Sequence, residues 1–406
     1  MKKLAAIILS LAAVLACEKD YGYEVAPDAP DDGYRYDSAE GASSGMGNGQ
    51  GQGGGQAGVV TAGEWNDLDN WPFWGRLMTR KSDEQTVGYA DVPAYWRFWT
   101  DRRVAVTVKD ASGNPQPGLS VELKSGADKV WTSVTDVYGR ADCWIGLYDN
   151  SYQTGTLSIT VNGMQMPEPP VVTSWSDEAV NMNEYQLMTL SAPVVESSAD
   201  ILFIVDATGS MMDEIDFLKA DLLNILQRSQ KLESSIKIRT GALFYRDEGD
   251  DYVTKDSPFT TDFDKTINFV KKQRADGGGD YPEAVHTALE VSLQKFDWNS
   301  KARARLAFML LDAPPHQDHQ GVIESLQKSI ETYAAKGIKL IPVASSGVDK
   351  PTEFCLRLFS IATGGTYVFL TDDSGVGGEH IEATVGDYEV EKLNDLIVRL
   401  IQKYLQ

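Results

Sequence analysis

One carboxylate and two hydroxyls alternate along a short loop of the chain. Asp206, Thr208 and Ser210 follow directly after the apolar run 201–205, which has the composition of a buried strand. Oxygens at positions i, i+2 and i+4 of a tight loop can converge on one point, and a hard cation such as Mg²⁺ binds about six oxygens at about 2.0–2.1 Å. Gly209 gives the loop freedom to turn. The spacing therefore predicts half of a divalent-cation site.

Two further carboxylates are expected at the same place. Asp312 closes the apolar run 306–311, and Asp280 follows three consecutive glycines in front of Pro282, which suits the first turn of a helix. Ligands of open α/β sheets bind outside the carboxyl ends of the strands, so we expect these three loops to meet there. A helix cap followed by a turn would explain the first loop without a metal, but not all three.

The elements that must position these loops alternate between strand and helix patterns from residue 198 to residue 406. Short, apolar and partly β-branched runs predict buried strands at 201–205, 236–244, 306–311, 338–344 and 366–370. Stretches with helical length and period predict helices at 211–225, 263–272, 282–296, 321–335 and 352–362. The alternation predicts an α/β fold with a doubly wound, mostly parallel sheet flanked by helices. Residues 252–259 would add an antiparallel edge strand.

Residues 101–192 are predicted to form a small all-β sandwich. Runs such as 104–108 and 119–123 alternate between apolar and polar residues, and turns recur about every ten residues. With the string TDVYGR at 135–140, the module resembles immunoglobulin-like or transthyretin-like repeats of extracellular proteins, which implies a spacer. The preceding segment 64–100 holds five of the nine tryptophans, and we expect it to pack on this module. Exposed tryptophans that stack on sugars or grip a partner are the alternative.

The amino terminus has the pattern of an export signal. Lys2 and Lys3 precede the mostly apolar segment 4–16, which is shorter than the roughly 20 residues that span a bilayer. The sequence VLAC, which ends at Cys17, resembles a bacterial lipobox, so we expect a signal peptide at 1–16 and a lipid on Cys17. An ordinary secretory signal is the alternative. The string EKD at 18–20 resembles export signals of surface lipoproteins, which favours an outer-membrane lipoprotein of the bacterial cell envelope, exposed at the surface.

Residues 17–63 are predicted to form the lipid anchor and a disordered tether. Acidic residues come first, and nine of the eighteen residues from 41 to 58 are glycine, so the segment has no apolar face to bury. A flexible coil of this length reaches roughly 35–40 Å. The membrane would be contacted through the lipid only.

Charge and cysteine content narrow the class of protein further. The formal charge of −22 becomes −24 once Lys2 and Lys3 are removed, and such a surface argues against nucleic acid as a partner. With Cys17 lipidated, only Cys143 and Cys355 remain. We expect them to be two lone buried thiols, and one disulfide is the alternative.

The predicted metal loops resemble those of the von Willebrand factor type A domain, which is shared by integrin inserted domains and many bacterial proteins. Its metal-ion-dependent adhesion site has an Asp-x-Ser/Thr-x-Ser motif, a central Thr or Asp loop and a later Asp. Asp206, Thr208, Ser210, Asp280 and Asp312 follow this order. The strings DATGSM, GGGDYPEA and LLDAPPH look like a bacterial subgroup that is similar to the hemicentin-type domain and to some atypical kinases.

The resemblance implies roles for these residues and for the metal. Thr208 and Ser210 would bind Mg²⁺, or Mn²⁺ or Ca²⁺, directly, and Asp206 and Asp312 would bind partly through water. One coordination position would stay open for an oxygen of the partner. Asp213 and Glu214 stand where integrin β chains have an adjacent second metal site. Acidic residues in the first turn of a helix are also favoured by the helix dipole, which is the simpler explanation for this pair.

These features predict a binding protein and not an enzyme. We expect a metal-dependent interaction with a protein or an extracellular-matrix-like ligand. Because Asp280 replaces the neutral Thr of integrin-type sites, three carboxylates against one Mg²⁺ give the site a formal charge of −1, which favours a neutral or basic partner surface. Two alternatives remain. The first is an envelope scaffold with a structural metal, and the second is metal-assisted hydrolysis with His316 or His319 as a base.

Overall fold

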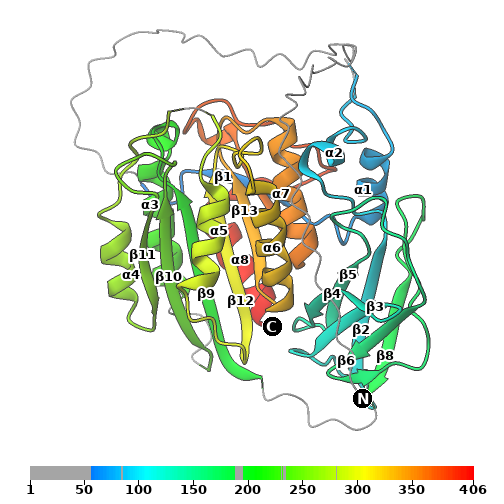
Figure 1. Cartoon of the computed structure of the whole chain (residues 1–406). Coiled ribbons are helices and arrows are strands. Elements are labelled where there is room, and N and C mark those ends of the chain that lie inside the picture. Colours follow the sequence, from blue (N-terminus) through cyan, green and yellow to red (C-terminus); the bar gives the residue numbers. More distant parts are fainter. Residues whose placement is uncertain (1–55, 84–85, 188–194, 230, 232–234, 280) are drawn as a thin grey trace, which may run out of the picture. The chain divides into compact units, whose positions relative to one another are not determined.

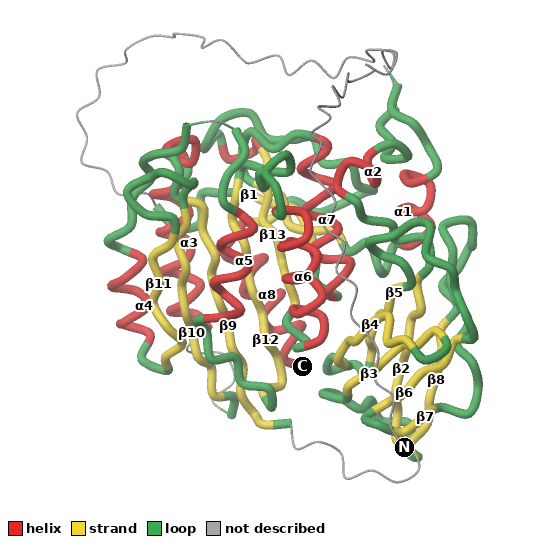
Figure 2. Tube along the Cα trace, in the orientation of Figure 1, coloured by secondary structure: helices red, strands yellow, loops and turns green. Residues whose placement is uncertain are grey.

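The computed structural model describes residues 56–83, 86–187, 195–229, 231, 235–279 and 281–406. The predicted signal peptide, the lipidation site Cys17, most of the tether and Asp280 lie outside these ranges. The described chain forms one large mixed sheet flanked by helices and two smaller sheets (Figures 1 and 2). This arrangement agrees with the predicted α/β fold for the C-terminal half.

The large sheet has eight strands in the order β11-β10-β9-β12-β13-β14-β1-β15. Its centre is parallel and is formed by β9 (Glu196–Asp206), β10 (Lys237–Tyr245), β12 (Ala302–Leu311), β13 (Lys339–Ala344) and β14 (Tyr367–Thr371). Strand β11 (Thr254–Thr260) pairs antiparallel with β10. The carboxyl ends of the parallel strands therefore lie at one edge, as the predicted metal site requires.

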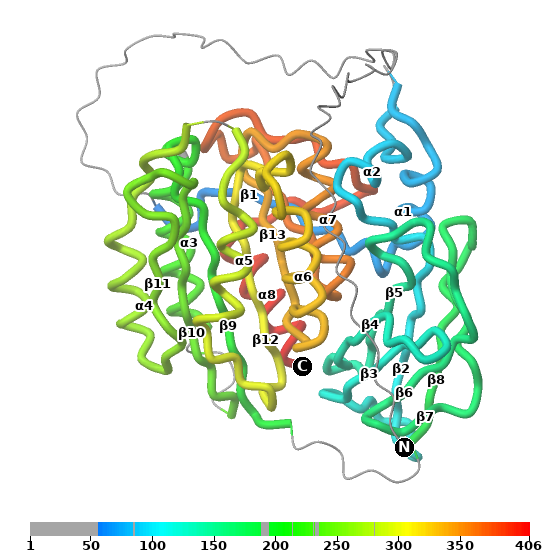
Figure 3. Tube along the Cα trace, in the orientation of Figure 1, coloured from blue at the N-terminus to red at the C-terminus, as the bar shows by residue number. Residues whose placement is uncertain are grey.

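The other end of the sheet is completed by residues that are distant in sequence. Strand β1 (Thr61–Trp65) pairs antiparallel with β14 and also with β15 (Glu391–Lys392). Figure 3 traces β1 in blue beside the orange and red C-terminal segments. Residues 61–63, which the sequence pattern assigns to the tether, belong to this strand. A five-residue strand with a central glycine has no clear alternation, so its sequence gives little signal.

In the part of the chain that the structure describes, three helices cover each face of the sheet. Helices α3 (Ile215–Ser229), α4 (Phe263–Val270) and α8 (Leu393–Leu405) share one apolar core with the sheet, and α5 (Val285–Gln294), α6 (Val322–Ala335) and α7 (Lys350–Thr363) share another. Strand β9 divides its side chains between them: Phe203 and Val205 pack into the first core, and Leu202 and Ile204 into the second. A strand buried on both faces reads as a continuous apolar run. Two short 3₁₀ helices, η1 (Gly209–Asp213) and η2 (Asp372–Ser374), follow β9 and β14.

Residues 103–187 contain two small sheets. One has the order β5-β2-β8 and consists of β2 (Arg103–Asp110), β5 (Arg140–Trp144) and β8 (Met182–Leu187). The other has the order β4-β3-β6-β7 and consists of β3 (Ser120–Ser125), β4 (Asp128–Val134), β6 (Leu157–Val161) and β7 (Met164–Gln165). We refer to residues 103–187 as the β-module. Its immunoglobulin-like or transthyretin-like character stays a prediction.

The tryptophan-rich segment is part of the folded core. It forms α1 (Trp71–Met78) and α2 (Val92–Trp96), in which Trp71, Trp74 and Trp96 are buried. Trp74 stacks on Phe354 of α7 with ring centroids 5.7 Å apart, and Trp71 packs against Trp144 of the β-module. These rings therefore fill the interior.

Two other expectations concern the cysteines and the helices. Cys143 and Cys355 are both buried and free, which confirms the expectation of two lone thiols. Among the described residues, the helices are too short or too polar to cross a membrane.

Candidate metal centre

The first loop of the site begins at the last residue of β9. Asp206 is fully buried, and strand pairing sets it opposite Tyr245 of β10. Thr208 donates two hydrogen bonds to Asp206 Oδ1, from its backbone N–H at 2.9 Å and from its hydroxyl at 2.7 Å. The hydroxyls of Thr208 and Ser210 lie 3.1 Å apart. The carboxylate and both hydroxyls of the predicted motif are thus gathered at one point.

The second loop follows β12, the parallel neighbour of β9. The register aligns Leu310 with Val205, so Asp312 emerges beside the Asp206 loop. Asp312 is buried, and although burial raises its pKa most, the Ser210 hydroxyl is near enough to lower this pKa, so the two loops lie side by side. Parallel pairing alone brings these two distant segments together, as the sequence predicts.

The third loop contributes a carboxylate that the sequence analysis did not select. Asp280, the predicted ligand of this loop, lies outside the described residues. Glu283, three residues later, is buried, and its backbone N–H donates a hydrogen bond to Pro314 O at 2.8 Å. A methyl group on Gly278 would lie 3.0 Å from Glu283 Oε1 and 3.3 Å from Thr208 Cβ, so the Glu283 carboxylate lies close to the first loop. Glu283 stands in the same GGGDYPEA string as Asp280, which was the available signal.

Glu283 also changes where the following helix begins. The sequence favours a helix start at Pro282, but α5 begins at Val285. Glu283 forms a bridge with Pro315 and gives its N–H to the loop after β12 instead of to a helical turn. The third loop is therefore held against the second by backbone contacts.

Four carboxylate oxygens at this edge are buried without a donor. Within the described ranges, Asp206 Oδ2, Asp312 Oδ1, Glu283 Oε2 and Glu214 Oε2 have no hydrogen-bond partner. Burial raises the pKa of Asp206 to about 6, of Asp312 to about 8 and of Glu283 to about 9, and repulsion between the carboxylates adds to each pKa shift. Buried acids without donors are costly unless a cation or a proton neutralises them.

This donor set fits a hard divalent cation. All of its atoms are carboxylate or hydroxyl oxygens, the ligands that Mg²⁺ and Ca²⁺ take, and they come from three loops at one edge. Asp206, Thr208, Ser210 and Asp312 are brought together as predicted, and Glu283 joins them. When bound, the metal would neutralise the carboxylates and could accept an oxygen from outside the protein.

The predicted second metal pair has a different environment. One oxygen of Glu214 accepts the backbone N–H of Ser346 at 3.0 Å and lies 3.2 Å from His380 Nε2. The side chain of Asp213 lies outside the described residues. Oε1 of Glu214 therefore has protein partners, whereas its Oε2 is buried without a hydrogen-bond partner among the described residues.

The two histidines after Asp312 form a separate cluster. His316 is buried, with Nε2 2.6 Å from Asp247 Oδ1, and its ring stacks on His319 with centroids 4.3 Å apart. With Asp318, the ligating atoms of these two histidines lie within 4.8 Å of one another. The contact with Asp247 therefore engages one of the two ring nitrogens of His316 and fixes the orientation of its ring.

Comparison with known proteins supports a von Willebrand factor A domain. This family matches residues 200–351, a range that contains all five predicted metal ligands. One similar protein is a mimivirus protein named as an ariadne-like RING finger protein (Acanthamoeba polyphaga mimivirus; 28% identity, 43% of this chain and 18% of that protein). Another is the alpha-protein kinase vwkA of Dictyostelium discoideum (30% identity, 33% of this chain and 21% of that protein).

The chain thus spans about a fifth of the length of these two relatives. A solved structure that is similar to part of the chain is a conserved hypothetical protein, BatB, from Bacteroides thetaiotaomicron. It is 13% identical, with a TM-score of 0.35, over 51% of this chain and 98% of that one.

Proposed function

We propose that this chain is a metal-dependent binding protein. A divalent cation, Mg²⁺ or alternatively Mn²⁺ or Ca²⁺, is held by Asp206, Thr208, Ser210 and Asp312 together with Asp280. Its open coordination position takes an oxygen of a protein or matrix-like partner. The observation that carries the proposal is the set of buried carboxylate oxygens without donors on adjoining loops. The match to the von Willebrand factor A domain, which suggests a role in protein interaction, supports it.

The charge of the site favours a neutral or basic partner. Asp206, Asp280 and Asp312 already outweigh one Mg²⁺, and Glu283 adds a fourth carboxyl group to the same edge. Each extra carboxylate holds the metal more tightly and leaves it a weaker electrophile. The chain also carries a formal charge of −22, so an acidic partner would be repelled within about one Debye length, roughly 8 Å.

Binding explains the site better than turnover does. Hydrolysis would need a strongly polarising metal and a free base near it. The carboxylate-rich donor set weakens the first requirement. His316, the conceivable base, is only 2% exposed, which weakens the second. The proposal is therefore a binding protein without catalytic residues.

The proposal includes export to the bacterial cell envelope. Residues 1–16 act as a signal peptide, Cys17 carries the lipid, and the tether keeps the folded part away from the outer membrane. Labelling of the mature protein with a radioactive fatty acid, lost in Cys17→Ser, tests this. Equal labelling of the variant would contradict lipidation at Cys17.

The binding proposal is tested by partner capture from intact cells and cell envelopes, with and without metal. The mature chain is used as bait in Mg²⁺ and in chelator, with Asp206→Ala as the site variant. Asp251→Ala, which changes an exposed acid, is the matched control. We expect partners that are retained only in Mg²⁺, by the wild type and by the control. A set of partners that is the same in chelator would contradict metal-dependent binding.

The charge preference is tested separately with synthetic peptides. Basic, neutral and acidic peptides of equal length are titrated onto the mature chain in Mg²⁺. We expect the acidic peptide to bind most weakly. An acidic peptide whose affinity rises with Mg²⁺ and disappears in Asp312→Ala would overturn the charge preference but leave metal-dependent binding intact.

A further inference from the structure

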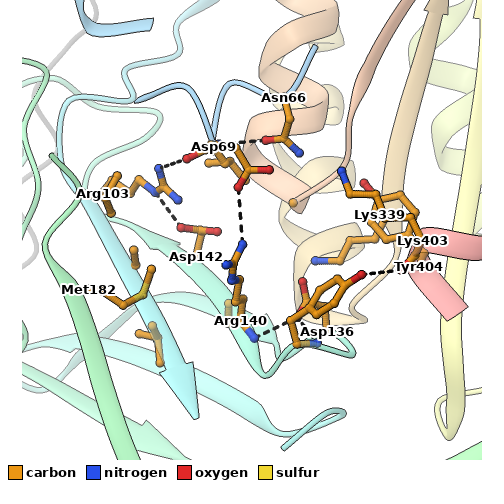
Figure 4. Close-up of a pocket in the computed structure, with 17 residues that line it drawn as sticks. Asn66, Asp69, Arg103, Asp136, Arg140, Asp142, Met182, Lys339, Lys403 and Tyr404 are labelled. Atoms are coloured by element: carbon orange, nitrogen blue, oxygen red, sulfur yellow. Dashed lines mark hydrogen bonds and ion pairs between the residues drawn. The ribbon is translucent and has the colours of Figure 1, made fainter. Parts of the chain in front are cut away.

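A cavity of about 250 Å³ lies where the β-module meets the amino-terminal edge of the large sheet (Figure 4). The β-module contributes side chains from β2, β5 and β8. The sheet contributes Lys339, the first residue of β13, and the end of α8 contributes Lys403 and Tyr404. The cavity is slightly smaller than the roughly 300–1,000 Å³ of sites for drug-sized ligands, so it suits a small molecule.

The acidic side chains of this cavity are already engaged by the protein. Asp142 accepts Arg103 Nε at 2.7 Å, and Asp69 lies 3.5 Å from Arg140. Asp136 accepts two backbone N–H groups, including that of Arg140, at 2.9 Å. Asp142 and Asp69 therefore face arginines, whereas Asp136 has only backbone donors and keeps its charge at the cavity.

The two lysines have no such partner. Within the described part of the chain, neither Lys339 Nζ nor Lys403 Nζ has a hydrogen bond or an ion pair. In Figure 4, dashed lines reach the guanidinium groups of Arg103 and Arg140, and none reaches an ammonium group. Lys339 is only 8% exposed. An ammonium at a cavity with no acceptor from the protein has its donors available to an anion.

The end of α7 explains how Lys339 is held in this position. Gly364 caps this helix with φ +70°, and a methyl group there would lie 2.5 Å from Lys339 Nζ. The ammonium thus lies against the carboxyl end of a helix, whose dipole stabilises a cation. The dipole supplies only a partial negative charge, so a full anion would still be attracted.

Further cations lie next to the cavity. A small adjoining hollow shares Lys339, Asp136 and Tyr404 and is also lined by Arg303 and Arg305 of β12. Arg305 already donates to three backbone carbonyls through one nitrogen. This edge is therefore locally basic in a chain whose formal charge is −22.

We infer that this cavity binds a small organic anion, a carboxylate or a phosphate ester. Lys339, Lys403 and Arg140 face its charged group, and the apolar side chains of Val106 and Met182 contact its remainder. Because the cavity is lined by both the β-module and the sheet, the anion contacts both. This site is separate from the metal centre, which lies at the carboxyl edge of the same sheet, and it does not depend on the proposed function.

The inference is tested by calorimetric titration of the mature chain at constant ionic strength. The probes are glutarate, inorganic phosphate and glutaramide, which has the shape of glutarate without its charges. We expect saturable binding of at least one anion and none of glutaramide. Lys403→Met should weaken binding at least fivefold and the double variant with Lys339→Met at least tenfold. The exposed control Lys271→Met should stay within twofold.

The probes also identify the anion, and the variants locate it. Tighter binding of glutarate identifies a carboxylate ligand, and tighter binding of phosphate identifies a phosphate ester. No saturable binding of either anion would overturn the inference, as would equal binding of glutaramide or unchanged affinity in Lys403→Met. Lys403 is half-exposed, so this variant should fold, and its unfolding midpoint checks that it does.

Discussion

The two edges of the parallel sheet collect opposite charges. At the carboxyl edge, Asp206, Asp312 and Glu283 are buried with oxygens that have no donor among the described residues. At the amino edge, Lys339 and Lys403 have no acceptor within the described ranges. In a fold where helices return between parallel strands, the helices begin at the carboxyl edge of the sheet and end at its amino edge. The helix dipoles therefore favour acids at the carboxyl edge and bases at the amino edge.

The two edges differ in how much the folded protein is destabilised when no ligand is bound there. The three acids crowd together, so that burial and mutual repulsion raise their pKa values. The lysines are spread around a cavity of about 250 Å³, and Lys339 is stabilised by the end of α7. We therefore expect the carboxyl edge to depend strongly on its cation and the amino edge to tolerate the absence of an anion.

The largest effect is expected from removing a metal ligand. Asp312→Ala removes a carboxylate that would contact the metal or a water bound to it. Mutation of residues that only hydrogen-bond to metal ligands already lowers metal affinity about 10–100-fold. We expect Mg²⁺ affinity to fall more than about 100-fold, measured by calorimetry. Asp251→Ala, at an exposed position, should leave it unchanged. A fall of less than tenfold in Asp312→Ala would show that this edge is not the cation site.

A smaller effect is expected from pH in the metal-free protein. Folding raises the pKa of Asp206 to about 6 and of Asp312 to about 8, so the folded state binds more protons than the unfolded state. Stability is then present at low pH and falls as pH rises through these values. The raised pKa of Asp206 alone corresponds to about 3 kcal/mol of stability lost between low and high pH.

The measurement is urea unfolding in chelator between pH 5 and pH 8. Saturating Mg²⁺ should flatten the profile, because the cation neutralises the same carboxylates. A metal-free protein that becomes more stable as pH rises would contradict the crowding of acids at this edge.

The sequence could predict those residues of the acidic edge that directly follow a strand. Asp206 and Asp312 each come directly after an apolar run, and parallel pairing brings two such ends together. Glu283 could not be selected in this way, because its position depends on a backbone hydrogen bond to Pro314 in another loop. Pairing of β1 with β14 joins Thr61 to Thr371, and a short strand with a glycine gives no periodic signal for it.

The basic edge could not be predicted for a related reason. Lys339 is the second residue of the predicted strand 338–344, and nothing in the sequence around it indicates a binding role. Its burial depends on the end of α7 and on the β-module, which are brought there by tertiary packing. A pattern along one strand contains no information on such contacts.

Glu283→Gln tests whether the crowding of acids at the carboxyl edge destabilises the metal-free protein. The substitution removes a buried acid whose pKa is raised to about 9, so the metal-free protein at pH 8 no longer takes up a proton on folding. We expect a gain of about 1–2 kcal/mol in the free energy of unfolding, after allowance for compensating hydrogen bonds. Glu379→Gln, at an exposed position, serves as the control and should change it by less than about 0.5 kcal/mol.

The same variant separates two roles of Glu283. If its carboxylate repels the other acids without contacting the metal, Mg²⁺ affinity should fall less than tenfold, far less than in Asp312→Ala. Destabilisation of the metal-free variant would mean that Glu283 is needed as a hydrogen-bond acceptor, and the crowding argument would fail at this residue.

The smallest effect is expected at the basic edge. Lys403→Met removes a half-exposed ammonium that has no ion pair within the described ranges, so little interaction energy is lost. We expect the unfolding free energy in anion-free buffer to change by less than about 0.5 kcal/mol. Arg103→Met is the contrasting variant, since its buried guanidinium pairs with Asp142 at 2.7 Å, and breaking such a pair costs about 3–5 kcal/mol. A loss in Lys403→Met as large as that in Arg103→Met would mean that this lysine stabilises the fold itself, and the contrast between the edges would fail.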